Sequence, residues 1–388
     1  MNSEKYISDI IKKIPSSGIR RFFDLVTNSK DIISLGVGEP DFTTPWLIRK
    51  EGIDALDRGS TTYTSNLGLP ELRIAISTFL KNHYNLDYNP EKEIMVTVGA
   101  SEAIDLAVRC LLNNDDEVLI PEPSYVSYAP CVALTRGIPV FVPTDARNNF
   151  KLTPDDLKSK ITRKTKALIL SYPNNPTGAI MTENDLYDIL NIIIENDLIV
   201  ISDEIYSELT YEGKHVSIAS LPEMKERTIL INGFSKAFAM TGWRLGYIAS
   251  NPAFIEAMNK IHQYTTICAP IMSQLAAIKG LNNCEEDVIK MRKTYDQRRR
   301  FIIKGFREIG FECFEPKGAF YIFPSIKKTG MDSQQFCERL LKEEKVAVVP
   351  GDAFGPSGNG FIRVSYAYSL DRIIKALEKI EHFARKFI

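Results

Sequence analysis

The sequence predicts an α/β protein with a large domain built on a mainly parallel sheet and a smaller α+β domain. Two observations carry this prediction: short β-branched runs alternate with helical patterns from about residue 94 to 250, and this alternation breaks after about residue 252. Continuous apolar strands separated by helices are typical of a parallel sheet that is covered on both faces. With 388 residues, the chain also exceeds the size at which one hydrophobic core stops growing.

Seven apolar runs supply the expected strands of the large domain. They are residues 94–98, 117–120, 139–142, 167–170, 198–201, 228–231 and 246–249. A helix is expected over residues 182–196, because its apolar side chains recur at helical spacing. Thr182 and Asp185, three positions apart, predict the N-cap of that helix.

The smaller domain is expected in the last part of the chain. A long helical region is predicted from about residue 252 to 310, and an amphipathic helix from about Leu370. The short strands expected between them lie near residues 311–314, 320–322, 347–349 and 361–364. We place the large domain at residues 46–295 and the small domain at residues 296–388, and we expect residues 1–45 to pack with the small domain.

Charge and composition exclude several classes of protein. The formal net charge is −1, so nothing favours binding to nucleic acid or to an anionic membrane. No apolar run approaches the length of a membrane span, and the N-terminus lacks the apolar core of a signal peptide. The six cysteines are scattered and the four histidines lie at no metal-ligand spacing, so we expect no metal site and a cytoplasmic protein. We interpret Arg298, Arg299 and Arg300 as a solvated helix face.

The strongest functional signal follows the strand expected at residues 228–231. Lys236 comes directly after Ser235 and eight positions before Arg244. An amine beside two phosphate ligands suits a covalently bound phosphorylated aldehyde, and pyridoxal phosphate is the common one. Taken alone, the grouping is equally well explained as solvated charges that flank a core strand, so the rest of the chain has to decide.

Polar residues beyond two other strands supply what the ring of pyridoxal phosphate needs. Asp203 follows residues 198–201 and would hold the proton of the ring nitrogen. Tyr206 and Asn175 could donate hydrogen bonds to the phenolate oxygen of the ring. Because ligands collect at the carboxyl ends of strands in such sheets, we expect these side chains to meet in one site.

The phosphate and the face of the ring also have candidate partners. Ala100 and Ser101 open a helix after residues 94–98, and their backbone N–H groups would bind the phosphate. Tyr125 is the candidate aromatic ring over the pyridine. Each piece has an ordinary alternative, since Asp203 could be a helix N-cap and Tyr125 a packing aromatic. Their joint occurrence at the strand ends of one sheet favours the cofactor site.

Five motifs in a fixed order make the chain resemble a known family. They are GVGEPDF at 36–42, YPNNPTG at 172–178, SDEIY at 202–206, SKAFAMTGWR at 235–244 and FIRVSY at 361–366. With them, the chain resembles the class I/II aminotransferases of pyridoxal-phosphate fold type I over nearly its whole length. It is most similar to the aspartate and aromatic aminotransferases of archaea and thermophilic bacteria.

This resemblance implies roles for individual residues. Lys236 would carry the cofactor and act as general base, with Asp203 and Tyr206 as further catalytic residues. Ala100, Ser101, Ser235 and Arg244 would bind the phosphate. The stacking position often carries tryptophan in the family, and Tyr125 occupies it here.

The resemblance also implies a substrate site and a partner. Arg363 would grip the α-carboxylate of the substrate with a two-pronged contact, aided by Gly38 and Asn175. Tyr63 matches the tyrosine that reaches the phosphate bound by the partner subunit, so a homodimer with shared sites is implied.

We therefore expect an enzyme that moves an amino group from aspartate or an aromatic L-amino acid to 2-oxoglutarate by a ping-pong mechanism. Residues 17–20 resemble the segment that closes over substrate in related enzymes, where Ile19 would suit an aromatic side chain and Arg20 a carboxylate. Two alternatives stay open on the same cofactor: a C–S β-lyase, and a regulatory protein that binds pyridoxal phosphate without turnover.

Overall fold

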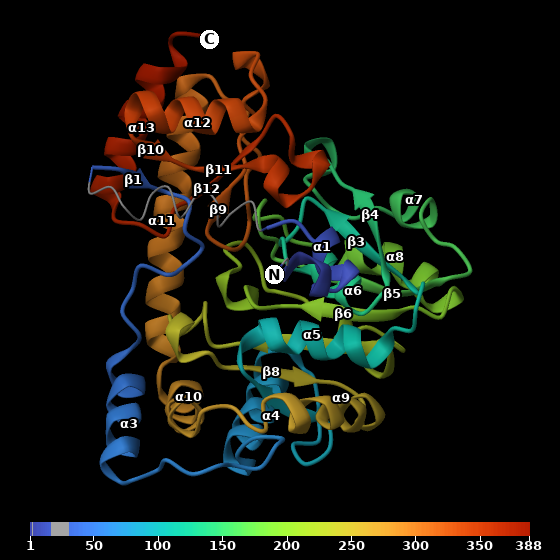
Figure 1. Cartoon of the computed structure of the whole chain (residues 1–388). Helices are drawn as coiled ribbons and strands as arrows, with labels where there is room; N and C mark the ends of the chain where they lie inside the picture. Colours follow the sequence, from blue (N-terminus) through green and yellow to red (C-terminus); the bar gives the residue numbers. More distant parts are fainter. Residues whose placement is uncertain (2, 17–30) are drawn as a thin grey trace.

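The computed structural model describes residue 1, residues 3–16 and residues 31–388. A seven-stranded sheet lies at the centre of its larger part (Figure 1). In the order of hydrogen-bonded neighbours, the strands are β2 (Ile94–Thr97), β8 (Gly246–Ala249), β7 (Thr228–Gly233), β6 (Ile199–Asp203), β5 (Thr165–Ser171), β3 (Glu117–Glu122) and β4 (Ile138–Pro143). Of these seven, β8 alone runs antiparallel to its neighbours, so the predicted, mainly parallel sheet is confirmed.

Helices cover both faces of the sheet, because successive side chains of a strand point to opposite sides. In β7, Ile229 and Ile231 belong to one core and Leu230 to another. The first core is completed by α5 (Gly99–Leu111), α6 (Tyr128–Leu134) and α9 (Pro252–Thr265). On the opposite face, α7 (Pro154–Lys158) and α8 (Glu183–Glu195) pack on β3 and β5, and α4 (Pro70–Tyr84) and α10 (Ile271–Asn283) pack near β2.

The predicted start of α8 is confirmed. The hydroxyl of Thr182 accepts a hydrogen bond from the backbone N–H of Asp185, whose carboxylate in turn accepts from the backbone N–H of Thr182. This reciprocal capping box satisfies two N–H groups that the helix itself leaves without partners.

A smaller part of the molecule lies beyond the 25-residue helix α11 (Glu285–Ile309), which is the long orange helix in Figure 1. Its antiparallel sheet consists of β11 (Val349–Pro350), β12 (Ile362–Ser365) and β9 (Tyr321–Ile322). Next to it, β1 (Ile33–Ser34) pairs in parallel with β10 (Val346–Ala347), and α12 (Ser333–Glu344) and α13 (Leu370–Ala384) complete this part. We retain the division at residues 295 and 296, which falls inside α11, as a proposal.

Two expectations from the sequence are wrong. Residues 311–314 form no strand: Glu312 makes one isolated bridge to Ser325, and Pro316, which has no N–H group, follows shortly. Arg298 and Arg299 are not solvated. The side chain of Arg298 is 13% exposed. Arg299 is 2% exposed, and its guanidinium donates to the carboxylate of Asp296 and to the carbonyl of Pro316. A charged side chain can be buried in this way because the fold supplies acceptors for it.

The predicted helical region from residue 252 to 310 is confirmed and consists of three helices. Between α9 and α10 the chain breaks at Pro270, and between α10 and α11 it breaks at Cys284. Near the N-terminus, the structure adds α1 (Asp9–Lys13) and α3 (Trp46–Asp57). Over the described ranges, no helix is both long enough and apolar enough to cross a membrane.

Candidate active site

A cavity of about 500 Å³ lies where β2, β5, β6 and β7 end. All the site residues predicted from the sequence line it, except Tyr63. They are Gly38, Ala100, Ser101, Tyr125, Asn175, Asp203, Tyr206, Ser235, Lys236, Arg244 and Arg363. The polar residues that follow the strands of the large sheet therefore do meet in one cavity, as predicted. Arg363 reaches the same cavity from β12 in the smaller part.

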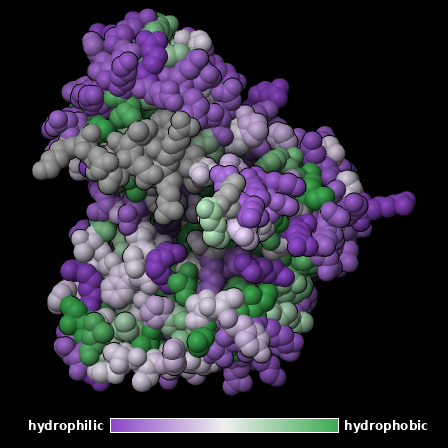
Figure 2. Space-filling view, viewed as in Figure 1, coloured by the Kyte–Doolittle hydropathy of each residue, from purple (hydrophilic) through white to green (hydrophobic). Residues whose placement is uncertain are grey.

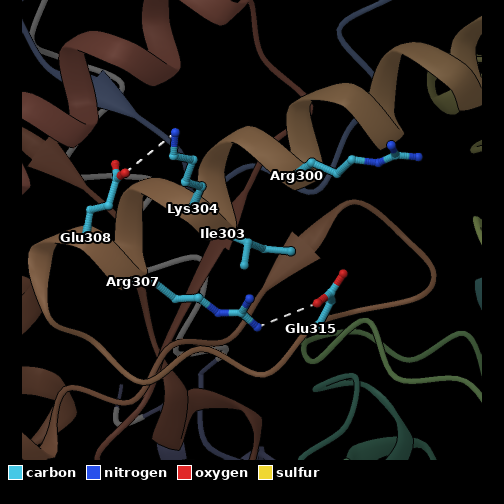
Figure 3. Close-up of a pocket in the computed structure, with 6 residues that line it drawn as sticks. All are labelled: Arg300, Ile303, Lys304, Arg307, Glu308 and Glu315. Carbon is cyan, nitrogen blue, oxygen red and sulfur yellow. Dashed lines mark ion pairs between the residues drawn. The ribbon is translucent and has the colours of Figure 1, made fainter.

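A shallower hollow on α11 carries none of these residues (Figure 3). Its lining charges are largely paired with one another: Lys304 lies 3.6 Å from Glu308, and Arg307 lies 3.6 Å from Glu315. Such exposed ion pairs are ordinary for a helix surface, so the cavity at the strand ends is the candidate active site.

Lys236 lines the cavity and is partly buried. Its Nζ atom donates a hydrogen bond of 2.7 Å to the carbonyl oxygen of Gly38. Burial lowers the pKa of the Lys236 ammonium to about 8; the charge of Glu39 opposes this shift, and the charges of Arg363 and Arg244 add to it. A substantial fraction of the amine is therefore neutral near pH 8, as a nucleophile or a base requires.

Asp203 ends strand β6 with its carboxylate buried against the cavity. The hydroxyl of Tyr128 donates to Oδ2 at 2.7 Å, and the backbone N–H of Ile205 donates to Oδ1 at 3.2 Å. Burial raises the pKa of Asp203, and the hydrogen bond from Tyr128 counters part of that rise. These neutral donors leave the carboxylate able to pair with a cation in the cavity.

The sequence did not reveal Tyr128. It begins α6 and lines the cavity, and its oxygen also lies 2.9 Å from the hydroxyl of Ser171 at the end of β5. Tyr125, which sequence reasoning did select, packs edge-on against Tyr128 with ring centroids 5.6 Å apart. Nothing in the local pattern distinguishes the two tyrosines, because the role of Tyr128 depends on strands that are far away in the sequence.

An anion-binding cradle forms where β2 passes into α5. Gly99 has a φ of +76°, and the N–H groups of Ala100 and Ser101 lie in the first turn of the helix, where they have no partner within it. A Cβ atom at Gly99 would lie 2.6 Å from Nη2 of Arg244, so a larger residue would displace this guanidinium from its present position. Arg244 is oriented by a hydrogen bond of 3.1 Å from Nη1 to the carbonyl of Thr241.

Arg363 reaches the opposite side of the cavity and is 2% exposed. Its Nη1 atom donates to Oδ1 of Asn175 at 2.9 Å, and its Nη2 atom donates to the carbonyl of Gly36. The guanidinium lies 4.5 Å from the ring centroid of Tyr321 and 4.8 Å from that of Phe354. Its Nε–H group has no partner among the described residues, so the guanidinium retains a free donor.

Tyr321 is a second residue that the sequence did not reveal. Its hydroxyl lies 2.8 Å from the hydroxyl of Tyr206. A Cβ atom at Gly38 would lie 2.3 Å from the same hydroxyl, so the backbone of Gly38 approaches this ring as closely as glycine allows. Tyr321 thus connects Tyr206, Gly38 and Arg363.

Tyr63 lies outside the cavity, in the loop between α3 and α4, and is 80% exposed. It makes no contribution to the cavity of its own chain. Ile19 and Arg20 lie outside the described residues.

Comparison with known proteins identifies the family. Residues 30–380 match the family described as aminotransferase class I and II. The chain belongs to this family.

Two relatives and one solved structure show how closely the chain resembles other members. The aspartate aminotransferase of Pyrococcus abyssi is 49% identical, with 98% of each chain covered. The aromatic-amino-acid aminotransferase 2 of Thermococcus litoralis is 46% identical, with 97% of each chain covered. The crystal structure of the aromatic aminotransferase from Pyrococcus horikoshii has a TM-score of 0.91 and 47% identity, and the match covers 95% of this chain and all of that one.

Aminotransferases of this family depend on pyridoxal phosphate, which is therefore the cofactor of this enzyme. The cavity fits that group. The cradle at Gly99 suits a phosphate, the buried carboxylate of Asp203 suits a ring nitrogen that carries a proton, and the amine of Lys236 suits an aldehyde.

Proposed function

We propose that this aminotransferase takes the amino group of aspartate or an aromatic L-amino acid and passes it to 2-oxoglutarate in two half-reactions. The observation that carries the proposal is the placement of Lys236 and Arg363 in one cavity of about 500 Å³. Transfer of an amino group needs an amine that can move a proton and a cation that can hold the carboxylate of the amino acid. The names of the relatives, aspartate in one case and aromatic amino acids in the other, support this range of donors.

We assign different residues to the phosphate and to the ring nitrogen of the cofactor. Arg244 and Ser235, with the N–H groups of Ala100 and Ser101, would hold its phosphate. Asp203 would keep the proton on the ring nitrogen, and bound pyridoxal phosphate then supplies an electron sink for the α-carbon of the substrate.

The face and the ring oxygen of the cofactor have proposed partners as well. Tyr206 and Asn175 would donate to the ring oxygen, and Tyr125 would lie over the ring.

Proton transfer is assigned to Lys236. Arg363 would fix the α-carboxylate with its guanidinium, beside Asn175 and the backbone of Gly38. With the substrate so oriented, Nζ of Lys236 would take the proton from the α-carbon of the substrate and return it to the carbon of the cofactor that carries the aldehyde. Because the pKa of Lys236 is lowered to about 8, a substantial fraction of the amine is neutral near that pH and can act as a base.

The charge balance of the cavity bears on the choice of donor. Among the described residues, the cations that line it are Lys236, Arg244 and Arg363, and each already has a proposed task. The second carboxylate of aspartate or 2-oxoglutarate therefore needs a cation from elsewhere. We propose that Arg20 or the partner subunit supplies it, and that Ile19 contacts aromatic side chains.

A homodimer is proposed from the surface of the larger part. In Figure 2 the lower half of the view, over α3, α4, α9 and α10, is mostly white and green, whereas the upper half is mostly purple. Large apolar side chains are exposed on α3, α4 and α9, namely Trp46, Ile53, Leu56, Ile74 and Tyr264. An apolar surface of this kind suits burial against a second copy, which would bring Tyr63 to the phosphate of the partner's site.

The free cysteines support a proposed reducing compartment. All six cysteines lie within the described residues, and none of them forms a disulfide. We therefore propose the cytoplasm as the location of the enzyme.

The test is a screen of single half-reactions. Purified holoenzyme is mixed with one amino acid at a time, without any acceptor, and the absorbance of the bound cofactor is followed. Aspartate and the aromatic amino acids should change the spectrum fastest and release one 2-oxo acid per site, and 2-oxoglutarate should then restore it. Continuous release of pyruvate and ammonia without an acceptor would instead indicate the C–S β-lyase, and an unresponsive spectrum the regulatory protein.

A further inference from the structure

Within the described range 31–388, two segments run between the larger and the smaller part of the molecule. Residues 35–45 begin beside β10, where the N–H of Leu35 donates to the carbonyl of Ala347. They end beside the segment that follows β7, where the hydroxyl of Thr44 donates to the carbonyl of Ala239. The other segment is α11, which contacts α10 near its start and α13 near its end (Figure 1).

Arg298 on α11 joins these two segments. Its Nη1 atom lies 2.8 Å from Oδ1 of Asp41, and both side chains are largely shielded from water. Phe42 packs edge-on against Tyr295, with ring centroids 5.3 Å apart. The guanidinium of Arg298 covers both rings, at 5.5 Å and 5.7 Å from their centroids. The contact therefore combines an ion pair with two aromatic faces, which fixes its geometry better than a surface pair does.

Asp41 follows closely on the residues of its segment that line the active site. Gly38 and Glu39 line the cavity, and the carbonyl of Gly38 accepts the hydrogen bond from Lys236. Two residues earlier, the carbonyl of Gly36 accepts from Arg363. Only two residues, Glu39 and Pro40, separate Asp41 from Gly38, so a displacement of Asp41 is transmitted to Gly38 over a short stretch of chain.

We propose that Arg298 is a positioning residue for substrate binding, which acts through Asp41 to hold Gly38 and Glu39 in place. It touches neither the cavity nor any residue proposed to bind the cofactor. The inference rests on the proposed role of Gly38 beside the substrate carboxylate. Because α11 joins the two parts, Arg298 also links residues 35–45 to the helix that leads into the smaller part.

The neighbours of Arg298 have different tasks. Arg299 binds Asp296 and the carbonyl of Pro316, so it secures a loop of the smaller part. Arg300 is exposed and pairs with Asp296 on its own helix, and in Figure 3 it extends away from Arg307 and Glu315. Arg300 is therefore a matched control: the same residue type on the same helix, without contact to the active-site segment.

The experiment compares holoenzymes carrying Arg298→Gln, Arg298→Lys, Asp41→Asn and Arg300→Gln. Arg298→Gln and Asp41→Asn should raise KM for the amino acid about tenfold with a much smaller change in kcat, because the carboxylate site is displaced rather than the proton transfer. Their double variant should lose little more than either single one, since both remove the same contact. Arg298→Lys should recover part of the loss, and Arg300→Gln should match the unmodified enzyme.

A second readout does not depend on turnover. Hydrogen exchange of the backbone amides in residues 36–42 should become about tenfold faster in Arg298→Gln and Asp41→Asn, and should be unchanged in Arg300→Gln. Unchanged exchange in this segment, or a KM equal to that of the Arg300→Gln control, would overturn the proposal. If Arg298→Gln fails to fold, Asp41→Asn and Arg298→Lys carry the same comparison. If the enzyme transfers no amino group at all, the exchange measurement still decides whether Arg298 holds the segment.

Discussion

Tyr128 donates a hydrogen bond of 2.7 Å to Oδ2 of Asp203, and both residues are buried at the edge of the central sheet. Asp203 comes from the end of β6, whereas Tyr128 comes from the start of α6. The bond stabilises the charged form of a carboxylate whose pKa burial otherwise raises. Tyr128 thus helps to keep Asp203 negative, which is the state that can pair with a protonated ring nitrogen.

Replacing Tyr128 with phenylalanine should weaken the enzyme without removing its cofactor site. The pKa of Asp203 should rise further, and kcat/KM should fall about 10- to 100-fold, as expected for the loss of a hydrogen bond to a charged acceptor. Steady-state kinetics and the rate of cofactor release check this result. Tyr187→Phe, which alters an exposed tyrosine on α8, serves as the control. If Tyr128→Phe has the same kcat/KM and the same rate of cofactor release as Tyr187→Phe, the hydrogen bond to Asp203 does not contribute to activity.

The lowered pKa of Lys236 predicts how the protein without cofactor responds to pH. The ammonium cannot attack an aldehyde, so the rate at which the apoprotein captures pyridoxal phosphate should rise with pH and level off above about pH 8. An unperturbed lysine would show a rise that continues to about pH 10.4. Rapid-mixing absorbance measurements distinguish the two profiles. Lys236→Ala should lose the reaction at every pH.

The same shift has a consequence for stability. The pKa of Lys236 is lower in the folded protein than in the unfolded chain. At a pH where the lysine is protonated in both states, it therefore destabilises the folded protein. This penalty disappears as the pH rises from about 8 to the pKa of the lysine in the unfolded chain. Lys236→Met should therefore stabilise the apoprotein at pH 7 by about 3 kcal/mol, and much less at pH 10.5. Equal stabilisation at both pH values would contradict the assigned pKa.

Much of the site could be predicted because its residues directly follow apolar runs that can be recognised as strands in the sequence. Lys236 and Asp203 directly follow apolar runs that had to be strands, and parallel strands place their carboxyl ends together. Tyr128 and Tyr321 were not predicted, because their roles depend on contacts between distant parts of the sequence. Tyr128 contacts Asp203, which is 75 residues away, and Tyr321 contacts Tyr206, which is 115 residues away. No local pattern encodes such distances.

The errors in the fold have the same origin. Arg299 follows a helical pattern in which a charged residue is normally solvated, but α11 is packed on several sides and supplies it with Asp296 and the carbonyl of Pro316. Residues 311–314 have the composition of a strand but meet a partner only once, at Ser325. Burial of a charge and pairing of a strand are both tertiary outcomes, so the sequence alone favoured the commoner alternative.

The close approach of Gly38 to Tyr321 predicts a suppressor. In Gly38→Ala the new Cβ would lie 2.3 Å from the hydroxyl of Tyr321 and 3.3 Å from its Cζ atom, so either the backbone at residue 38 or the ring of Tyr321 must shift. A loss of about 100-fold in kcat/KM is expected, with the cofactor spectrum retained. Adding Tyr321→Phe removes the clashing oxygen and should recover about tenfold, although Tyr321→Phe alone should lower activity slightly through its lost bond to Tyr206. A double variant no better than Gly38→Ala would mean that the clash is not what disables the site.

The proposed homodimer with shared sites predicts complementation between two defective variants. Tyr63 is exposed and outside the cavity of its own chain, so it can serve a phosphate only in another subunit. Tyr63→Phe should bind the cofactor more weakly, and Lys236→Ala should be inactive. When the two are mixed and allowed to exchange subunits, a hybrid dimer contains one site with both Lys236 and Tyr63 intact. At limiting pyridoxal phosphate, activity should therefore exceed that of either parent, up to one working site per hybrid dimer. Mixing Tyr63→Phe with a Tyr63→Phe, Lys236→Ala double variant is the matched control, because no hybrid of that pair restores a complete site. Equal activity in both mixtures would show that Tyr63 does not act across the dimer.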